Sequence, residues 1–246
     1  MQRALITTGM VQGDLITIPP GEAFHHLRRV LRAKPGEAIE CLDGQGGVYR
    51  GMLAEASDRA LVVRVDERLD EPQPRLAITL AQALIRPEHF EWAIQKATEL
   101  GVARIVPLVT ARTVRGASGG AASGRLARWR RIMESAAVQC GRARLPALDE
   151  PQTLEQMLVD FGGSRGVFLT PAESGTPIAS AAAALAGAPS VTVFIGPEGD
   201  FSPEEIALAQ RAGLTPVRLG PRVLRAETAA VAAVAILQCL AGEWHA

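Results

Sequence analysis

The sequence predicts an α/β domain with a parallel sheet, preceded by a small antiparallel β-barrel. After about residue 75, short runs rich in β-branched residues alternate with segments of helical periodicity, which is typical of βαβ units. Before Glu71, short strand-like runs are separated by turn dipeptides, which favours a barrel. The "EPQP" stretch of residues 71–74 separates the two patterns. We therefore expect the barrel over residues 1–71 and the α/β domain over residues 72–246.

The barrel part contains turn signals and one short basic helix candidate. Asp43-Gly44 and Gly46-Gly47 are strong turn dipeptides between alternating strands. The expected elements are strands over 15–20, 38–44, 47–56 and 60–69, and a helix over 23–36. Small barrels of this kind often bind RNA.

The α/β part carries clear helix boundaries. Pro87 begins a helix that Gly101 ends, and Ser202, Pro203 and Glu205 together form a capping-box start. The expected strands cover 75–84, 102–109, 166–170, 191–195 and 216–220, and the expected helices cover 87–100, 125–141, 154–161, 178–186, 203–212 and 227–240. The segment 116–124 is rich in Gly, Ala and Ser and is interpreted as a linker.

Composition limits the class of protein. The chain has 246 residues, with 48% hydrophobic and 21% charged residues, as a soluble globular protein has. The longest apolar run, Ala229 to Ala241, is only about a dozen residues, so no membrane span is expected. Cys41, Cys140 and Cys239 are far apart and odd in number, which favours a reduced, cytoplasmic compartment and no metal site.

The formal net charge is +0, yet the cations are clustered. Between Gly101 and Leu145, Glu134 is the only acidic residue among many arginines. A second cluster holds His25, His26, Arg28, Arg29, Arg32 and Lys34. The planar guanidinium group of arginine can donate two hydrogen bonds to the oxygens of a phosphate, so the clusters favour an RNA partner. Both clusters also have an interpretation without RNA. The arginines can form a solvated helix face, and His25 and His26 can be a core histidine and its exposed neighbour.

Three late strands each end in a loop, with sequences "LTPAES", "IGPEGD" and "LGPRVLRAET". Ligands of open α/β sheets collect at such carboxyl ends, although each loop taken alone is also compatible with an ordinary βα turn. The Walker A, Gly-x-Gly-x-x-Gly and HExxH motifs are absent, which excludes most kinases, dehydrogenases and zinc-dependent hydrolases. A site built from backbone groups remains, suited to an adenosine-like ligand with an amino-acid tail.

The segments "FIGPEGDFSPEE" and "LGPRVLRAETAAVAA" resemble the paired signature of the ribosomal small-subunit methyltransferase E family, in the SPOUT class of enzymes that use S-adenosylmethionine (SAM). "HHLRRVLRAKPGE", "DGQGGVYRG", "IQKATELGVARIVPLVTARTV" and "QCGR" are also similar to family segments, so the resemblance covers nearly the whole chain. It implies a PUA-like barrel, a SPOUT domain with a trefoil knot, and a homodimer. The implied reaction is methylation of N3 of one uridine in 16S rRNA, near the decoding centre of the assembled small subunit.

The resemblance also implies site residues. The cofactor set is Leu169, Thr170, Pro171, Ile195, Gly196, Pro197, Glu198, Gly199, Leu219, Gly220, Arg222 and Leu224. The family usually has a glycine where this chain has Asp200, and Asp tolerates left-handed backbone. The candidate RNA-binding residues are His26, Arg29, Arg32, Arg86, Arg112 and Arg142.

The chemistry of uracil N3 suggests the catalytic candidates. N3 carries a proton at neutral pH, so a site needs a route for that proton and donors for the charge that develops on O2 and O4. We assign oxyanion stabilisation to Arg225 and name Glu227 or Glu198 as base or orienting carboxylate; Glu227 is equally compatible with a helix-capping role. Two other functions stay open: a non-catalytic RNA-binding or ribosome assembly protein, and a small-molecule enzyme that uses a nucleotide cofactor.

Overall fold

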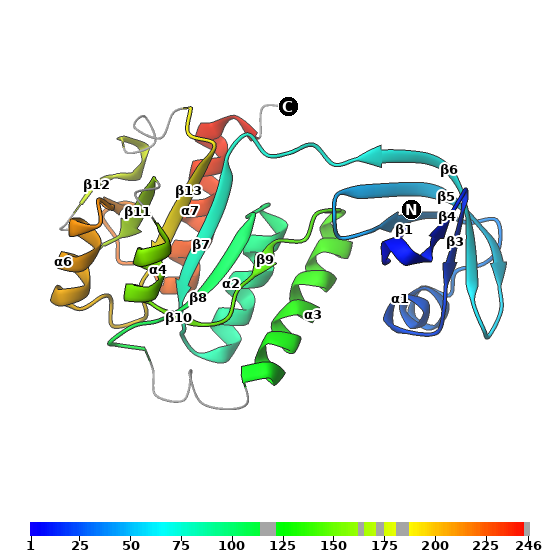
Figure 1. Ribbon diagram of the computed structural model, residues 1–246, viewed down its shortest axis with the longest axis horizontal. Helices are drawn as coiled ribbons and strands as arrows, with labels where there is room; N and C mark the ends of the chain where they lie inside the picture. The colour runs from blue at the N-terminus through cyan, green and yellow to red at the C-terminus, as the bar shows by residue number, and fades with distance from the viewer. Residues whose placement is uncertain (114–121, 162–164, 171–174, 181–186, 244–246) are drawn as a thin grey trace. The chain divides into compact units, whose positions relative to one another are not determined.

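A computed structural model describes residues 1–113, 122–161, 165–170, 175–180 and 187–243 (Figure 1). The chain forms two compact units. Unit 1 contains Met1–Gln73 and Glu134–Leu145, and unit 2 contains Pro74–Met133 and Pro146–Ala246. The predicted boundary at Glu71 lies close to Gln73, but the sequence did not indicate that residues 134–145 belong with the first unit.

Unit 1 is built on a six-stranded sheet with the order β1-β4-β5-β6-β3-β2. The strands are β1 (Gln2–Leu5), β2 (Val11–Gln12), β3 (Leu15–Ile18), β4 (Ala38–Leu42), β5 (Gly47–Ala56) and β6 (Leu61–Asp70). The prediction of a purely antiparallel sheet was wrong, because β1 pairs with β4 in parallel. Parallel pairing needs a long connection, and β2, β3 and a helix lie between β1 and β4 in the chain.

A short helical segment covers the core of this sheet. The segment begins as α1 (Glu22–His25) and continues as a π-helix, η2 (His26–Val30). A separate 3₁₀ turn, η1 (Thr8–Met10), lies earlier in the chain. Leu27 is fully buried among Ile16, Ile39 and their neighbours. The segment ends at Arg32, whose φ of 53° is left-handed, and the Ala33 N–H donates to the Leu27 carbonyl at 2.9 Å. The helix is therefore shorter than the predicted 23–36.

Glu40 on β4 is the charged group that is most buried in unit 1, with 5% of the residue exposed. Its carboxylate accepts hydrogen bonds from Arg3 Nε at 2.8 Å and Arg50 Nε at 2.9 Å. Burial raises the pKa of Glu40, but the bonds from Arg3 and Arg50 outweigh burial and hold the pKa below its ordinary value. The carboxylate therefore stabilises the fold above its unfolded pKa of about 4.3, and this stability is lost as the pH falls through the lower folded value.

We expect Glu40→Gln to lower the free energy of local unfolding of β4 and β5 by about 1–2 kcal/mol at pH 7, and to flatten the loss of stability in acid. The effect is smaller than for a fully buried pair, because the two arginine side chains stay 36% and 45% exposed. Amide hydrogen exchange across β4 and β5 measures it. Glu67→Gln is the matched control, because Glu67 contacts Arg50 at the surface and its substitution should change the free energy of unfolding little. Equal effects of the two substitutions would contradict this account.

Unit 2 is built on an eight-stranded sheet in which every recorded pairing is parallel, as predicted. The strand order is β10-β8-β7-β13-β11-β14-β12, and β9 pairs with β8. The strands are β7 (Ala77–Ala83), β8 (Arg104–Val109), β9 (Ala147–Leu148), β10 (Gln152–Thr153), β11 (Gly166–Leu169), β12 (Thr176–Pro177), β13 (Ser190–Ile195) and β14 (Thr215–Arg218).

Helices cover both faces of this sheet (Figure 1). One core joins the sheet to α2 (Pro87–Glu99), α3 (Ala122–Cys140) and α7 (Ala226–Ala241), and the other joins it to α4 (Leu154–Phe161) and α6 (Pro203–Arg211). Successive residues of β13 alternate between the cores, with Val193 in the first and Phe194 in the second. The predicted helix over 178–186 lies largely outside the described residues.

The local helix signals are confirmed. Ser202 and Glu205 form the capping box at the start of α6, with Pro203 at the first helical position. α7 ends at Gly242, whose φ is 79°. On α3, Leu126, Trp129 and Met133 are buried, whereas Arg128, Arg130 and Arg131 are exposed, so these arginines lie on the solvent-facing side of the helix.

Candidate functional site

The carboxyl ends of β11, β13 and β14 meet at one edge of the sheet, because these strands are parallel neighbours. The end of β11, the loops after β13 and β14, and the start of α7 line a cavity of about 320 Å³, a volume at the lower end for small-molecule sites. Its lining consists of Leu169, Thr170, Ile195, Gly196, Pro197, Glu198, Asp200, Leu219, Gly220, Arg222, Val223, Leu224, Arg225, Ala226 and Ala229. Two of the three loops that the sequence singled out thus line one cavity together with the end of β11, and the rest of the third loop, residues 171–174, lies outside the described residues.

The β13 loop is a tight turn at Asp200. The Asp200 N–H donates to the Pro197 carbonyl at 2.9 Å, and Asp200 Oδ1 accepts the Phe201 N–H at 2.8 Å. Asp200 has a φ of 61°, so it adopts the left-handed conformation that the usual glycine would favour. Phe201 is buried edge-on to Phe168 and anchors the end of the loop in the core. Asp200 therefore adopts the left-handed turn at the position where the family usually has glycine.

Burial raises the pKa of Asp200, and the Phe201 N–H and then Arg112 only partly counter it. The folded state therefore favours the protonated acid, and the contribution of Asp200 to stability decreases as the pH rises above its ordinary pKa of about 3.9. At pH 7 we expect Asp200→Asn to be at least as stable as the wild type, since Asn keeps an acceptor for Phe201 and tolerates the turn. Asp200→Val should lose about 1–2 kcal/mol through the left-handed backbone. Urea unfolding measures both, and equal stability of the Asn and Val variants would argue against the strained turn.

The β14 loop forms the opposite wall. Gly220 has a φ of 153°, and a side chain built there would meet no atom within 4 Å, so it would project into open space. Arg222, Val223 and Arg225 are exposed along the rim, and Arg225 is the N-cap residue of α7. Ala226 and Ala229 complete the wall one helical turn apart.

Glu227 lies next to this wall but does not line the cavity. The residue is 9% exposed, and its Oε1 lies 3.5 Å from Nδ1 of His89 on α2. Its Oε2 is buried and has no hydrogen-bond partner among the residues that the structure describes. Glu198 and Arg225, in contrast, are exposed at the cavity. Of the three catalytic candidates, Glu198 and Arg225 can meet a ligand directly, whereas Glu227 is placed to orient its neighbours. The sequence held no sign of the His89 contact, which depends on the packing of α2 against α7.

The predicted cofactor set lines the cavity except at two positions. Gly199 packs against the side chain of Arg112 instead, and Pro171 lies outside the described residues. Two further lining residues, Asp200 and Val223, lie within the loops that the sequence singled out, although the predicted set omits them. Sequence reasoning missed Ala226 and Ala229 as lining residues. Only the spacing of the two alanines, at the start of the small-residue helix, could have indicated them.

The candidate RNA-binding residues are spread over both units. His26, Arg29 and Arg32 share the short helical segment of unit 1, where Arg29 and Arg32 are exposed and His26 is half-buried. His25 is exposed, so neither histidine is a core residue. Arg142 is half-buried and its pKa is lowered by burial, with Glu71 opposing that shift. Arg86 and Arg112 are exposed on unit 2.

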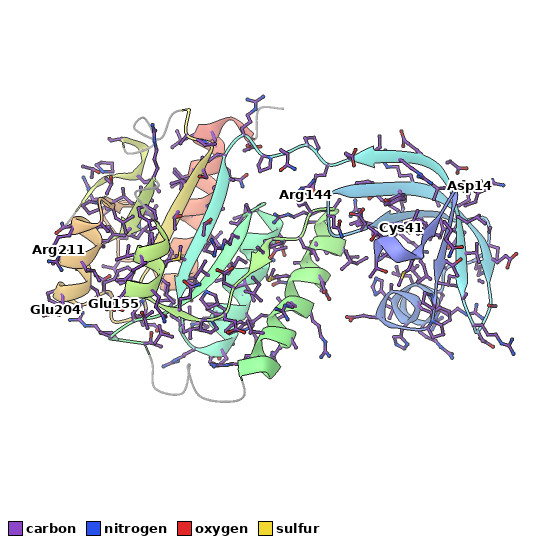
Figure 2. The ribbon with its side chains drawn as sticks, in the orientation of Figure 1. Asp14, Cys41, Arg144, Glu155, Glu204 and Arg211 are labelled. Atoms are coloured by element: carbon purple, nitrogen blue, oxygen red, sulfur yellow. The ribbon has the colours of Figure 1, made fainter. Side chains whose placement is uncertain are left out.

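A second cavity of about 590 Å³ lies beside the starts of α4 and α6. Figure 2 labels three charged residues of its lining, Glu155, Glu204 and Arg211. Two other polar residues of its lining, Ser202 and Glu205, bond each other in the capping box. Within the described residues, no cluster of three or more His, Cys, Asp and Glu side chains could hold a metal ion, and no helix is long and apolar enough to span a bilayer.

Comparison with known proteins defines the class to which this fold and cavity belong. Residues 71–238 match the family model of an RNA methyltransferase domain, and residues 19–66 match that of an RNA methyltransferase PUA domain. The chain is thus an RNA methyltransferase by class, and a PUA domain precedes the α/β domain.

The relatives specify the family within this class. The chain is 34% identical to the ribosomal RNA small subunit methyltransferase E of Mycobacterium tuberculosis, over 94% of this chain and 89% of that protein. It is 36% identical to the Synechocystis protein of the same name, over 88% and 71% of the two chains. The chain belongs to the ribosomal RNA small subunit methyltransferase E family, as the sequence motifs suggested.

Solved structures agree with this assignment. The family member from Neisseria gonorrhoeae, solved with bound S-adenosyl methionine, superposes with a TM-score of 0.87 at 26% identity and 98% coverage of both chains. A Legionella pneumophila methyltransferase solved with SAM gives a TM-score of 0.82 at 34% identity and 96% coverage of both chains.

Proposed function

We propose that this chain uses SAM to methylate N3 of one uridine in 16S rRNA, near the decoding centre, within the assembled small ribosomal subunit. The observation that carries the proposal is the cavity at the carboxyl ends of β11, β13 and β14, in a chain whose relatives are named for small-subunit rRNA methylation. The same proposal includes a PUA-like barrel, a trefoil knot in the late loops, a homodimer and a cytoplasmic location. The methyltransferase structures solved with SAM support this cofactor.

The residues of the cavity suit SAM. Leu169, Ile195 and Leu219 supply apolar surface for an adenine ring, and the open space in front of Gly220 leaves room for close contact with the backbone. Glu198 and Arg222 offer charges of both signs for an amino-acid tail. When bound, SAM supplies an electrophilic methyl group on a sulfonium centre.

The chain's own residues then have to accept the N3 proton and stabilise the negative charge that develops on the uracil oxygens. Arg225 is exposed at the cavity, where its guanidinium can donate to a uracil oxygen as negative charge forms. Glu198 is exposed on the facing loop and is our candidate for accepting the N3 proton or passing it to water. Glu227, buried and 3.5 Å from His89, is proposed to hold the start of α7 and hence Arg225 in place.

The target base must leave its helix before it reaches this site, because N3 lies on the Watson–Crick edge. We propose that Arg29 and Arg32, together with His26, grip the RNA backbone through unit 1. Arg86, Arg112 and Arg142 are further candidates for phosphate contacts. If so, substituting Arg29 and Arg32 reduces both the affinity for small subunits and its dependence on salt.

A methyl-transfer assay tests the proposal. Labelled SAM is incubated with the protein and with small subunits that lack the modification, free 16S rRNA, or large subunits as a control. We expect transfer to small subunits and little to the other substrates. Binding of small subunits without transfer to any substrate would instead indicate a non-catalytic RNA-binding or assembly protein.

A further inference from the structure

The loop that forms the β13 wall of the cavity is held from outside by a turn that follows β8. The turn covers residues 110–113, where the Thr113 N–H donates to the Thr110 carbonyl at 3.1 Å and the Thr110 N–H donates to Thr113 Oγ1 at 2.8 Å. This arrangement fixes the two residues between them, Ala111 and Arg112, against the β13 loop. Neither residue lines the cavity.

Arg112 makes the central contacts of this support. Its Nη1 donates to the Gly199 carbonyl at 2.7 Å and lies 3.4 Å from the Phe201 carbonyl. Its aliphatic carbons also pack beneath Gly199, 3.5 Å from the position that a side chain would occupy. Gly199 lies between Glu198 and Asp200, which both line the cavity. Arg112 thus contacts the backbone directly behind two cavity residues.

A second bond secures the other end of the same loop. The Ala111 N–H donates to Glu205 Oε1 at 2.8 Å, and the other oxygen of Glu205 accepts the Ser202 N–H at 2.8 Å. The turn after β8 therefore holds the β13 loop at two points. The Arg112 side chain bonds the Gly199 carbonyl, and the Ala111 backbone N–H bonds the Glu205 side chain at the start of α6. The left-handed residue, Asp200, lies between these two attachments.

We infer that Arg112 is a positioning residue for the methyl-donor site, in addition to any contact with RNA; this inference rests on the proposed function. A strained turn at an exposed rim adopts several conformations unless its surroundings fix it. Without the charged donor, Gly199 loses its partner and the binding-competent loop becomes a minor conformation. If about one-tenth of the molecules then hold the competent loop, the apparent affinity for SAM falls about tenfold.

Three variants of the full chain test this inference: Arg112→Ala, Arg112→Lys, and Arg131→Ala as a control. Arg131 is an exposed arginine of α3, so Arg131→Ala also removes one positive charge, but at a position that is not in the β13 loop or the turn after β8. The readouts are SAM affinity by calorimetry, KM for SAM and kcat, small-subunit affinity, and the thermal midpoint without ligand. Because Arg112 is exposed, we expect all three variants to fold.

Arg112→Ala should raise the Kd and KM for SAM about tenfold while kcat stays within about twofold. Arg112→Lys keeps the charge, but its flexible, strongly hydrated ammonium replaces the planar guanidinium whose Nη1 contacts both carbonyls, so most of the loss should remain. Arg131→Ala should bind SAM like the wild type. Wild-type SAM affinity in Arg112→Ala, or full recovery in Arg112→Lys, would overturn the positioning role. A wild-type chain that binds no SAM would overturn the proposed function itself.

Discussion

Arg225→Ala is expected to lower kcat by about 100- to 1,000-fold, the usual cost of removing one donor to a developing oxyanion. The affinity for SAM should stay within about threefold, because the interaction with uracil oxygens strengthens only as the N3 proton leaves. Arg225 is exposed at the N-cap position of α7, so its loss removes no core packing. Single-turnover methyl transfer on small subunits, with calorimetry of SAM binding in parallel, measures the two quantities separately.

Two other arginines serve as comparisons for Arg225. Arg222→Ala removes a cation from the same rim and should weaken SAM binding more than it lowers kcat, since Arg222 is assigned to the cofactor. Arg211→Ala, on α6, should change neither quantity. Unchanged turnover in Arg225→Ala would remove Arg225 from the mechanism and leave the uracil oxygens without an assigned donor.

Gly220→Val is expected to reduce SAM affinity by more than about 100-fold, equivalent to about 2.7 kcal/mol of binding free energy. Two effects act together at this position. The φ of 153° is a backbone conformation that a β-branched residue rarely adopts. The valine side chain would also project into the open space of a cavity of about 320 Å³. Calorimetry of SAM binding measures the loss.

The matched control is Gly213→Val. Gly213 has a φ of 84° and open space around it, and it lies at the end of α6, outside the cavity lining. It shares the backbone strain but not the steric block, so it should lower the thermal midpoint while the folded protein binds SAM normally. Equal SAM affinities of the two variants would mean that Gly220 does not face the cofactor.

The sequence was most informative about features that are determined by residues close together in the chain. Ser202, Pro203 and Glu205 predicted the start of α6, and the β-branched run before Gly196 predicted β13. The pattern of parallel strands predicted that three loops share one edge of the sheet, and the resemblance to the family then implied most of the residues that line the cavity. Asp200 also behaved as its residue type suggested, since it adopts the left-handed turn.

Features that depend on contacts between distant segments could not be predicted. The parallel pairing of β1 with β4 joins residues 37 positions apart, such as Gln2 and Ile39, and the two short strands and the helix between them carry no signal of it. The His89–Glu227 contact and the support of Gly199 by Arg112 depend on side-chain packing between elements. A lone His or Arg in a sequence gives no indication of such a partner, so Arg112 was first interpreted as an RNA contact.

The central claim is that this chain methylates N3 of a single uridine, and the most direct test is the identity of the product. Small subunits lacking the modification are treated with the protein and SAM, and the 16S rRNA is digested and examined by mass spectrometry of nucleosides and of mapped fragments. The account predicts one N3-methyluridine, in a fragment near the decoding centre. A methyl group on another atom or base, or no methylated nucleoside under conditions where SAM and subunits both bind, would contradict it.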